Sequence, residues 1–308
     1  MSQSRSSSHF NKIKAWSSFL KLPVVKRTVG ILEGVHPCIF KGQGQDFDDL
    51  HIYQPGDDIR NIDWKSSAKQ EIPVIKRFRA DSNTNLALVL DSGCQMQTRS
   101  TSGEKKIDIV EAVCEVFAYL STNRSDAVGV VAGNSEHIMN EKFRLRYGGI
   151  KPVLNKVAKI TSAQAPDSSY VRVLAYLTQF FIKRTFFVLV FDESAYRREK
   201  SVMLPIIRRL KERHDLFVVT IKDANPFASD TPNMSGKVID IKTKNFVPAY
   251  FRRSNVVKLA KKSIKSNRDK LNKDLKNMQI AHVNVGGTDD FFLKLSKILS
   301  RKEVAKYR

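Results

Sequence analysis

Two uninterrupted apolar runs, each ending at an aspartate, restrict the fold of this chain more than any other feature of its sequence. One run covers Leu86–Leu90 and meets Asp91, and the other covers Phe186–Phe191 and meets Asp192. A strand that is apolar at every position has to be covered on both faces, which is the situation of a central strand in a mostly parallel sheet. Stretches with the periodicity of helices separate such runs, so the sequence predicts an α/β protein.

The same alternation continues along the chain. Further strands are expected at 127–132, 216–221 and 280–285, an extended edge at 136–147 and a weaker strand at 238–241. Helices are expected at 107–120, 152–160, 170–181, 202–210, 255–278 and 289–299. This order predicts a mostly parallel, Rossmann-type sheet with helices on both faces, spanning residues 83–308. Ligands of such sheets bind beyond the carboxyl ends of the strands, where we expect Asp91 and Asp192.

The chain before residue 83 has a different character. Residues 1–29 combine a polar, serine-rich start with an amphipathic helix expected at 10–22, and Pro23 stops the helical pattern. Residues 30–82 are rich in the glycine and proline of turns but also carry apolar side chains of the kind that are buried. We therefore expect three parts: an N-terminal arm and helix, an ordered lobe with short strands, and the sheet domain.

The charge of the chain favours some partners over others. Its 308 residues include 53 Lys and Arg against 31 Asp and Glu, which gives a formal net charge of +22. Such a field attracts polyanions: an anionic membrane surface, nucleic acid or an acidic protein. The basic helix expected at 255–278 has no aromatic side chains interleaved with its lysines, so nucleic acid is the least favoured of the three.

The sequence also indicates a location. It contains no run of roughly 20 apolar residues, the length that spans a bilayer, and its start lacks the features of a secretory signal. The three cysteines, Cys38, Cys94 and Cys114, are odd in number and lack the spacing of metal ligands, which is typical of free thiols in a reducing compartment. We expect a soluble protein of the cytoplasm.

The most distinctive stretch lies in the lobe and reads GQGQDFDDLHIYQPGDDIRNIDWKSSAK. Side-chain-to-backbone bonds from Asp57 and Asp58 are expected to fix the turn at Pro55 and Gly56. Arg60 and Asp63 follow in the same stretch; Arg60 would pair with a carboxylate, and the neighbouring tryptophan would anchor the lobe in the core. The alternative, that this carboxylate cluster holds a divalent ion, stays open.

This stretch resembles the signature of the domain of unknown function family number 58, G-x-G-x-[DE]-F-x-D-L-R-x-Y-x-P-G-D-D-x-R-x-I-D-W-x-x-[ST]-A-R. His51 and Lys69 stand where the family usually has arginine. The matching residues are Gly42, Gly44, Asp46, Phe47, Asp49, Leu50, Tyr53, Pro55, Gly56, Asp57, Asp58, Arg60, Ile62, Asp63, Trp64, Ser67 and Ala68.

The resemblance implies properties that composition does not reveal. It implies a von Willebrand factor A-like fold after the signature, and a MoxR-type AAA+ ATPase as partner in chaperone-like or metal-insertion work. The two N-terminal membrane spans of many members are not expected in this chain.

The von Willebrand A-like fold often carries a metal-ion-dependent adhesion site with the motif D-x-S-x-S and a later Thr and Asp. Here the motif reads Asp91-Ser92-Gly93-Cys94-Gln95, so both serines are replaced. The candidate metal ligands are then Asp91, Ser92, Gln95, Ser168 (or its neighbour Ser169) and Asp192. Loss of two hydroxyl ligands implies a weak or absent site, because Mg²⁺ requires an octahedron of oxygens. We expect no cofactor, with Mg²⁺ as the option left open.

The motifs of nucleotide-binding loops, zinc proteases and serine hydrolases are absent from the sequence. The leading hypothesis is a non-catalytic adaptor that binds a MoxR-type AAA+ ATPase and presents clients to it. Its expected contact surfaces are the carboxyl edge of the sheet and the lobe residues Asp57, Asp58, Arg60, Asp63 and Trp64. One alternative is a polyanion-binding module. The other is a Mg²⁺-dependent phosphohydrolase that uses Asp91, Asp192 and the Asp57/Asp58 pair.

Overall fold

The computed structural model describes residues 46–53, 59, 62–79, 85–122, 127–144, 147–162, 164–224, 241, 245–246 and 254–304. The chain divides into two compact units, of which the smaller is Glu33–Asn83, and each unit is described by itself. The helix expected at 10–22, the strand expected at 238–241 apart from Ile241, and three lobe residues lie outside the described residues. Those three residues are Asp57, Asp58 and Arg60.

The smaller unit is a two-stranded ribbon with a short helix. Strand β1 (Asp46–Ile52) pairs antiparallel with β2 (Val74–Arg79), and α3 (Trp64–Gln70) lies between them in the chain. Asp63 caps the helix, because its carboxylate accepts the backbone N–H groups at the second and third helical positions. The hydroxyl of Ser67 accepts the N–H of Val74 at 2.9 Å and so attaches the helix to β2.

The expectation that Trp64 anchors the lobe in the core is wrong, because the side chain of Trp64 is 70% exposed. Side chains of a helix lean toward its N-terminus, and Trp64 is the first helical residue, so no preceding turn lies beneath its ring. Ile59, also expected to be of the buried type, is 62% exposed. The lobe therefore presents apolar side chains to its surroundings.

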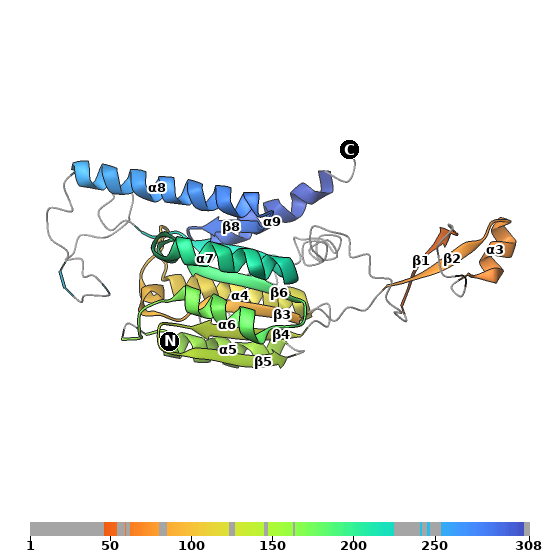
Figure 1. Cartoon of the computed structure of the whole chain (residues 1–308), viewed down its shortest axis with the longest axis horizontal. Coiled ribbons are helices and arrows are strands. Elements are labelled where there is room, and N and C mark those ends of the chain that lie inside the picture. Colours follow the sequence, from red (N-terminus) through yellow and green to blue (C-terminus); the bar gives the residue numbers. More distant parts are fainter. Residues whose placement is uncertain are drawn as a thin grey trace. The chain divides into compact units, whose positions relative to one another are not determined.

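The larger unit contains the sheet. Its strands are β3 (Asn85–Asp91), β4 (Val128–Gly133), β5 (Ile138–Arg144), β6 (Thr185–Asp192), β7 (Asp215–Ile221) and β8 (Ala281–Val285). They lie in the order β5-β4-β3-β6-β7-β8, and every neighbouring pair is parallel except β4 with β5 (Figure 1). The expected antiparallel edge is thus confirmed as β5.

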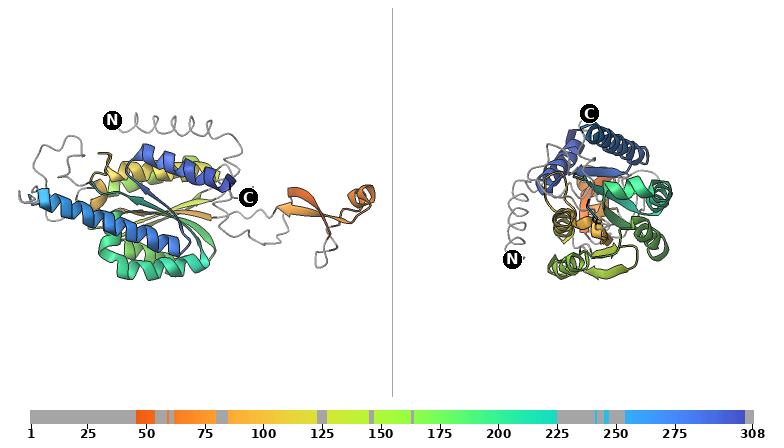
Figure 2. Two further views of the ribbon diagram at one scale, coloured as in Figure 1. Left: turned by 90° about the horizontal axis from the view of Figure 1, so that it is seen from above. Right: turned by 90° about the vertical axis from the view of Figure 1, so that its left-hand side faces the viewer.

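Two layers of helices enclose the sheet (Figure 2). One face packs against α4 (Lys106–Thr122), α5 (Tyr147–Ile160) and α9 (Thr288–Val304). The other packs against α6 (Tyr170–Phe180), α7 (Glu193–Arg213) and α8 (Ser254–Asn277). The prediction of an α/β protein with helices on both faces of a mostly parallel sheet is confirmed.

Successive side chains of a central strand enter opposite layers. In β3, Leu86, Leu88 and Leu90 face the first layer, whereas Ala87 and Val89 face the second. Each fully buried large apolar side chain contributes about 1.5–3 kcal/mol, so the middle of the sheet holds the unit together. This burial explains why the sequence is apolar at every strand position.

Two helices begin earlier than the sequence indicates. Helix α7 starts at Glu193, directly after β6, rather than at Val202. Its first turns are mostly charged and carry few apolar residues, so the sequence shows no helical apolar pattern there, although Ala195 is fully buried. Helix α5 starts at Tyr147 rather than at Pro152, because the proline lies inside the helix instead of at its first position.

Candidate functional site: the carboxyl edge of the sheet

The carboxyl edge of the sheet contains a topological switch point between β3 and β6. From β3 the chain adds β4 and β5 on one side, and from β6 it adds β7 and β8 on the other. Crevices at such points are where open α/β sheets bind ligands. Asp91 ends β3 and Asp192 ends the neighbouring β6, so the structure brings these two carboxylates to one edge.

Asp91 is completely buried beside a sharp turn. Its Oδ1 accepts the N–H of Gly93 at 2.8 Å, whereas its Oδ2 has no hydrogen-bond partner among the described residues. Burial, and then the negative charge of Asp192, raise the pKa of Asp91 to about 7, against the opposing effect of the Gly93 N–H. Asp91 is therefore the less readily ionised carboxylate of the edge.

Asp192 has a complete set of donors. It caps α7 by accepting the N–H of Ala195 at 2.8 Å and the hydroxyl of Ser194 at 2.9 Å. Its Oδ2 also accepts a charged hydrogen bond from Lys106 Nζ at 2.9 Å. Burial alone would raise the pKa of Asp192, but the Lys106 ammonium, the Ala195 N–H and the charge of Arg198 together hold this pKa below its ordinary value.

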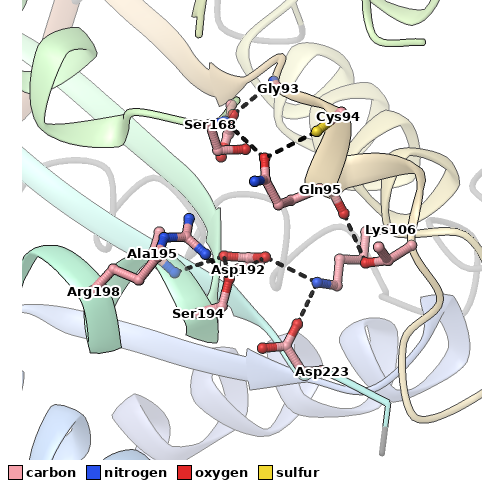
Figure 3. Close-up of polar contacts among 12 residues, drawn as sticks. Gly93, Cys94, Gln95, Lys106, Ser168, Asp192, Ser194, Ala195, Arg198 and Asp223 are labelled. Atoms are coloured by element: carbon pink, nitrogen blue, oxygen red, sulfur yellow. Dashed lines mark hydrogen bonds and ion pairs between the residues drawn. The ribbon is translucent and has the colours of Figure 1, made fainter. Parts of the chain in front are cut away.

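Lys106 is the centre of the site and is not among the site residues predicted from the sequence. Its ammonium group is only 3% exposed and lies between the carboxylates of Asp192 and Asp223 (Figure 3). Asp223 follows β7 by two residues, so a third strand end contributes a carboxylate. Burial, and then the negative charge of Asp192, raise the pKa of Asp223 despite the opposing Lys106 charge. The Lys106 ammonium bonds to both carboxylates.

A signal for both missed residues was present in the sequence. Asp223 stands just beyond an expected strand, as Asp91 and Asp192 do. Lys106 is the first residue of α4, and a helix N-terminus disfavours positive charge. A lysine at that position therefore indicates a compensating carboxylate nearby.

The turn after β3 is fastened to a second loop. Gln95 accepts the N–H of Ser168 at 2.7 Å with its Oε1 and donates to Asp167 Oδ1 at 3.3 Å with its Nε2. The backbone N–H of Cys94 donates to the carbonyl of Pro166 at 3.0 Å. Cys94 is 3% exposed, as expected for a small buried thiol. Gln95 thus joins two loops that lie 73 residues apart in the chain.

The residues at this edge do not fit the octahedral Mg²⁺ shell of a metal-ion-dependent adhesion site. Three buried oxygens, Asp91 Oδ2, Ser92 Oγ and Ser168 Oγ, have no hydrogen-bond partner among the described residues. However, a Cβ added to Gly93 would come closer than 3.0 Å to Oγ, N and Cα of Ser168, so no serine fits there without movement of the loop. The Gln95 amide is engaged with Ser168, and Asp192 already holds a cation.

The structure gives less information about the five lobe residues that are predicted to bind a protein. Asp57, Asp58 and Arg60 lie outside the described residues, and Asp63 serves as the cap of α3. Trp64 is exposed and is therefore accessible to a partner. The protein-binding role assigned to these residues stays a prediction.

Sheet order and switch-point carboxylates together define a Rossmann-type α/β protein with one antiparallel edge strand. Comparison with protein families adds the family to which this sheet belongs. The chain belongs to the family described as protein of unknown function DUF58, whose model matches residues 49–248, more than half of the chain. The family resemblance seen in the signature is confirmed.

Relatives and solved structures are distant. Uncharacterized proteins of Mycobacterium bovis and Mycobacterium tuberculosis are 28% identical over 155 residues, which cover 50% of this chain and 48% of each relative. The chain thus matches about half the length of these curated relatives.

Similar solved structures include the conserved hypothetical protein BatB from Bacteroides thetaiotaomicron, with 10% identity and a TM-score of 0.45. That similarity covers 71% of this chain and 98% of the other. A von Willebrand factor type A protein from Catenulispora acidiphila has 12% identity and a TM-score of 0.34, over 59% of this chain and 43% of the other. Among the helices of the described residues, none is both long and apolar enough to cross a membrane.

Proposed function

We propose that this chain is a non-catalytic adaptor that binds a MoxR-type AAA+ ATPase and presents client proteins to it, in the cytoplasm, for chaperone-like remodelling or metal insertion. Membership of the DUF58 family supports the partner class, because that family resemblance implies a MoxR-type partner. In this proposal the chain acts by binding, and ATP hydrolysis in the partner supplies the energy.

The observation that carries the proposal is the engagement of the edge charges with one another. Lys106 and Asp192 are 3% and 0% exposed and bind each other at 2.9 Å. A general acid or base has to reach within hydrogen-bond distance of its substrate, whereas these groups fix the loops around them. Because these charged groups are buried and bonded to one another, we expect the edge to bind a protein surface rather than to catalyse a reaction.

Exposed residues of both units offer contacts for such a partner. In the larger unit, the segment 97–105 runs along the carboxyl edge and exposes Arg99 and Lys105. In the smaller unit, Trp64 offers a large apolar ring, and tryptophans are among the side chains that most often dominate the energy of protein interfaces.

The test is co-purification from the native cell. A tagged wild-type chain is expected to enrich an AAA+ ATPase over an untagged control, and Trp64→Ala is expected to reduce the recovery at least several-fold. Phe180→Ala is the matched control, because Phe180 is 63% exposed but lies at the end of α6 in the larger unit. Absence of any AAA+ protein from the wild-type eluate would contradict the proposal.

A basic face of α8 supports polyanion binding as a second candidate function. The helix buries Leu271 and Leu275 against the unit, so its polar face points away from the sheet. Exposed lysines on it are Lys258, Lys261, Lys262, Lys265, Lys270, Lys273 and Lys276. The test is binding to phosphatidylserine vesicles at several salt concentrations. Polyanion binding predicts an affinity that falls steeply as salt rises, and that is lower in a variant with these lysines changed to glutamine. Undetectable binding at low salt would remove it.

A further inference from the structure

Lys106 is fixed in place by its surroundings. The isolated bridge between Ser100 and Asp223 connects the segment before α4 to the loop after β7, and the bridge between Arg99 and Lys105 closes that segment on itself. The backbone of Lys106 therefore lies next to the loop after β7, and its side chain binds the carboxylate of Asp223 in that loop. The ammonium is therefore tethered at the sheet edge and is not free to move out into solvent.

Local forces alone disfavour this lysine. The N-terminus of α4 carries the positive end of the helix dipole, which repels an ammonium group. A buried ammonium also loses its hydration, and it is tolerated only where carboxylates replace the lost water. The carboxylates of Asp192 and Asp223 are the compensation that the structure provides.

The charges at the edge require a cation. Asp192 and Asp223 are 0% and 21% exposed, so water screens their mutual repulsion poorly. The nearby Glu193 is already paired with Arg268 Nε at 2.5 Å, which leaves that arginine engaged elsewhere. Arg198 adds a positive charge near Asp192 but donates to the Ser194 hydroxyl. Among the described residues, Lys106 is the cation that bonds to both aspartates.

We propose that the Lys106 ammonium acts as a built-in cation at this edge and replaces the divalent ion of a metal-ion-dependent adhesion site. Gly93 and Gln95 fit the same interpretation, because neither supplies a hydroxyl ligand. Gln95 instead accepts the N–H of Ser168, and Gly93 allows the backbone of Ser168 to approach closely. The edge consequently keeps its arrangement, and remains available for binding, without Mg²⁺. This inference does not depend on the AAA+ partner, since the isolated chain can test it.

The experiment compares thermal unfolding of the full chain in EDTA and in millimolar Mg²⁺ or Mn²⁺. The melting temperature of the wild type is expected to be the same in all three. Lys106→Met removes the cation that bonds the buried Asp192 and the half-buried Asp223, so its melting temperature in EDTA should fall by roughly 6–20 °C. Mg²⁺ should then recover part of that loss, because the vacated position between Asp192 and Asp223 accepts a cation.

Two further variants keep the test decisive if Lys106→Met does not fold. Lys106→Arg retains the charge and is expected to fold and to ignore Mg²⁺. The double variant Lys106→Met with Asp223→Asn removes one charge of each sign, so it should be more stable than Lys106→Met and less responsive to Mg²⁺. Lys200→Met is the matched control, because it breaks a more exposed pair with Asp274 (2.8 Å) and should show no response to metal.

Three results would overturn the inference. The first is a saturable rise of the wild-type melting temperature with Mg²⁺, which would mean that the edge binds a metal ion beside the lysine. The second is a Lys106→Met variant as stable as the wild type. The third is a destabilised Lys106→Met variant that Mg²⁺ does not recover, which would reduce Lys106 to an ordinary ion pair. None of these results depends on whether a partner ATPase binds.

Discussion

Substitution of Gly93 by serine would introduce the hydroxyl that the metal-ion-dependent adhesion motif has at that position, and its effect on stability tests how rigid the edge is. The backbone of Gly93 has φ −75° and ψ 165°, an extended conformation that any residue adopts. Were there room, the change would therefore stabilise the fold by about 0.4–1 kcal/mol, because it reduces the freedom of the unfolded chain. The sign of the effect thus depends on space alone.

The structure leaves no such space. The new Cβ would meet three atoms of Ser168, and two of them, N and Cα, belong to the backbone, so rotation of a side chain cannot relieve the overlap. Overpacking of this kind costs about 1–3 kcal/mol. Displacing Ser168 also threatens its hydrogen bond with Gln95, which is worth about 1 kcal/mol. We expect a net loss of about 1–3 kcal/mol.

Urea unfolding of the wild type and of Gly93→Ser measures this difference, and thermal unfolding should give a fall of about 2–4 °C for each kcal/mol. Gly93→Ala is expected to match Gly93→Ser, because the overlap involves Cβ and not the hydroxyl. Ser168→Gly in the serine background removes one of the three contacts and should restore little. If Gly93→Ser were as stable as the wild type or more so, the loop would be free to move and the steric argument against a metal site would fail.

Further predictions concern three other parts of the molecule. Asp91 has a folded pKa of about 7, above its ordinary 3.8, so its contribution to stability is complete below pH 4 and is lost as the pH rises toward 7. The free energy of unfolding of Asp91→Asn should therefore rise relative to that of the wild type as the pH increases from 4, by up to about 4 kcal/mol at pH 8. Equal pH profiles of the two proteins in urea unfolding would refute the raised pKa of Asp91. Asp63→Ala removes the cap of α3 and should cost the smaller unit about 1 kcal/mol, seen as faster proteolysis there and unchanged unfolding of the sheet; unaltered proteolysis would count against the capping role. Tyr170→Phe removes the hydroxyl that donates to the Val89 carbonyl at 3.0 Å in a fully buried position, and should lower the free energy of unfolding by about 1 kcal/mol, whereas a gain in stability would show that this bond is unimportant.

The sheet could be predicted from the sequence because its central strands are buried on both faces. In β3 and β6 every position after the first is apolar up to the terminal aspartate, and no helix or surface strand requires that pattern. The same argument places Asp91 and Asp192 at one edge, since parallel neighbours end on the same side. Family resemblance added the class of fold, which the apolar pattern alone does not specify.

The details of the site could not be predicted, because they depend on contacts between distant segments. Nothing near Gln95 in the sequence indicates that its amide binds the backbone of Ser168. The position of Lys106 at the start of a helix indicates a carboxylate partner, but it does not say which one, because Asp223 lies 117 residues further along the chain. The prediction that Trp64 is buried is wrong for a different reason. Apolar side chains are buried on average, but apolarity does not show which individual side chain has another element to pack against.

The smaller unit has a thermodynamic consequence of its own. A two-stranded ribbon is marginal in water, and among its described side chains only Ser67, Val74 and Ile75 are buried. Its amides should therefore exchange with deuterium far sooner than those of β3 and β6. A partner that covers this ribbon would restrict its fluctuations at the moment of association, so lost chain entropy would offset part of the binding enthalpy. Recognition through this unit would accordingly be specific in its contacts yet easily reversed.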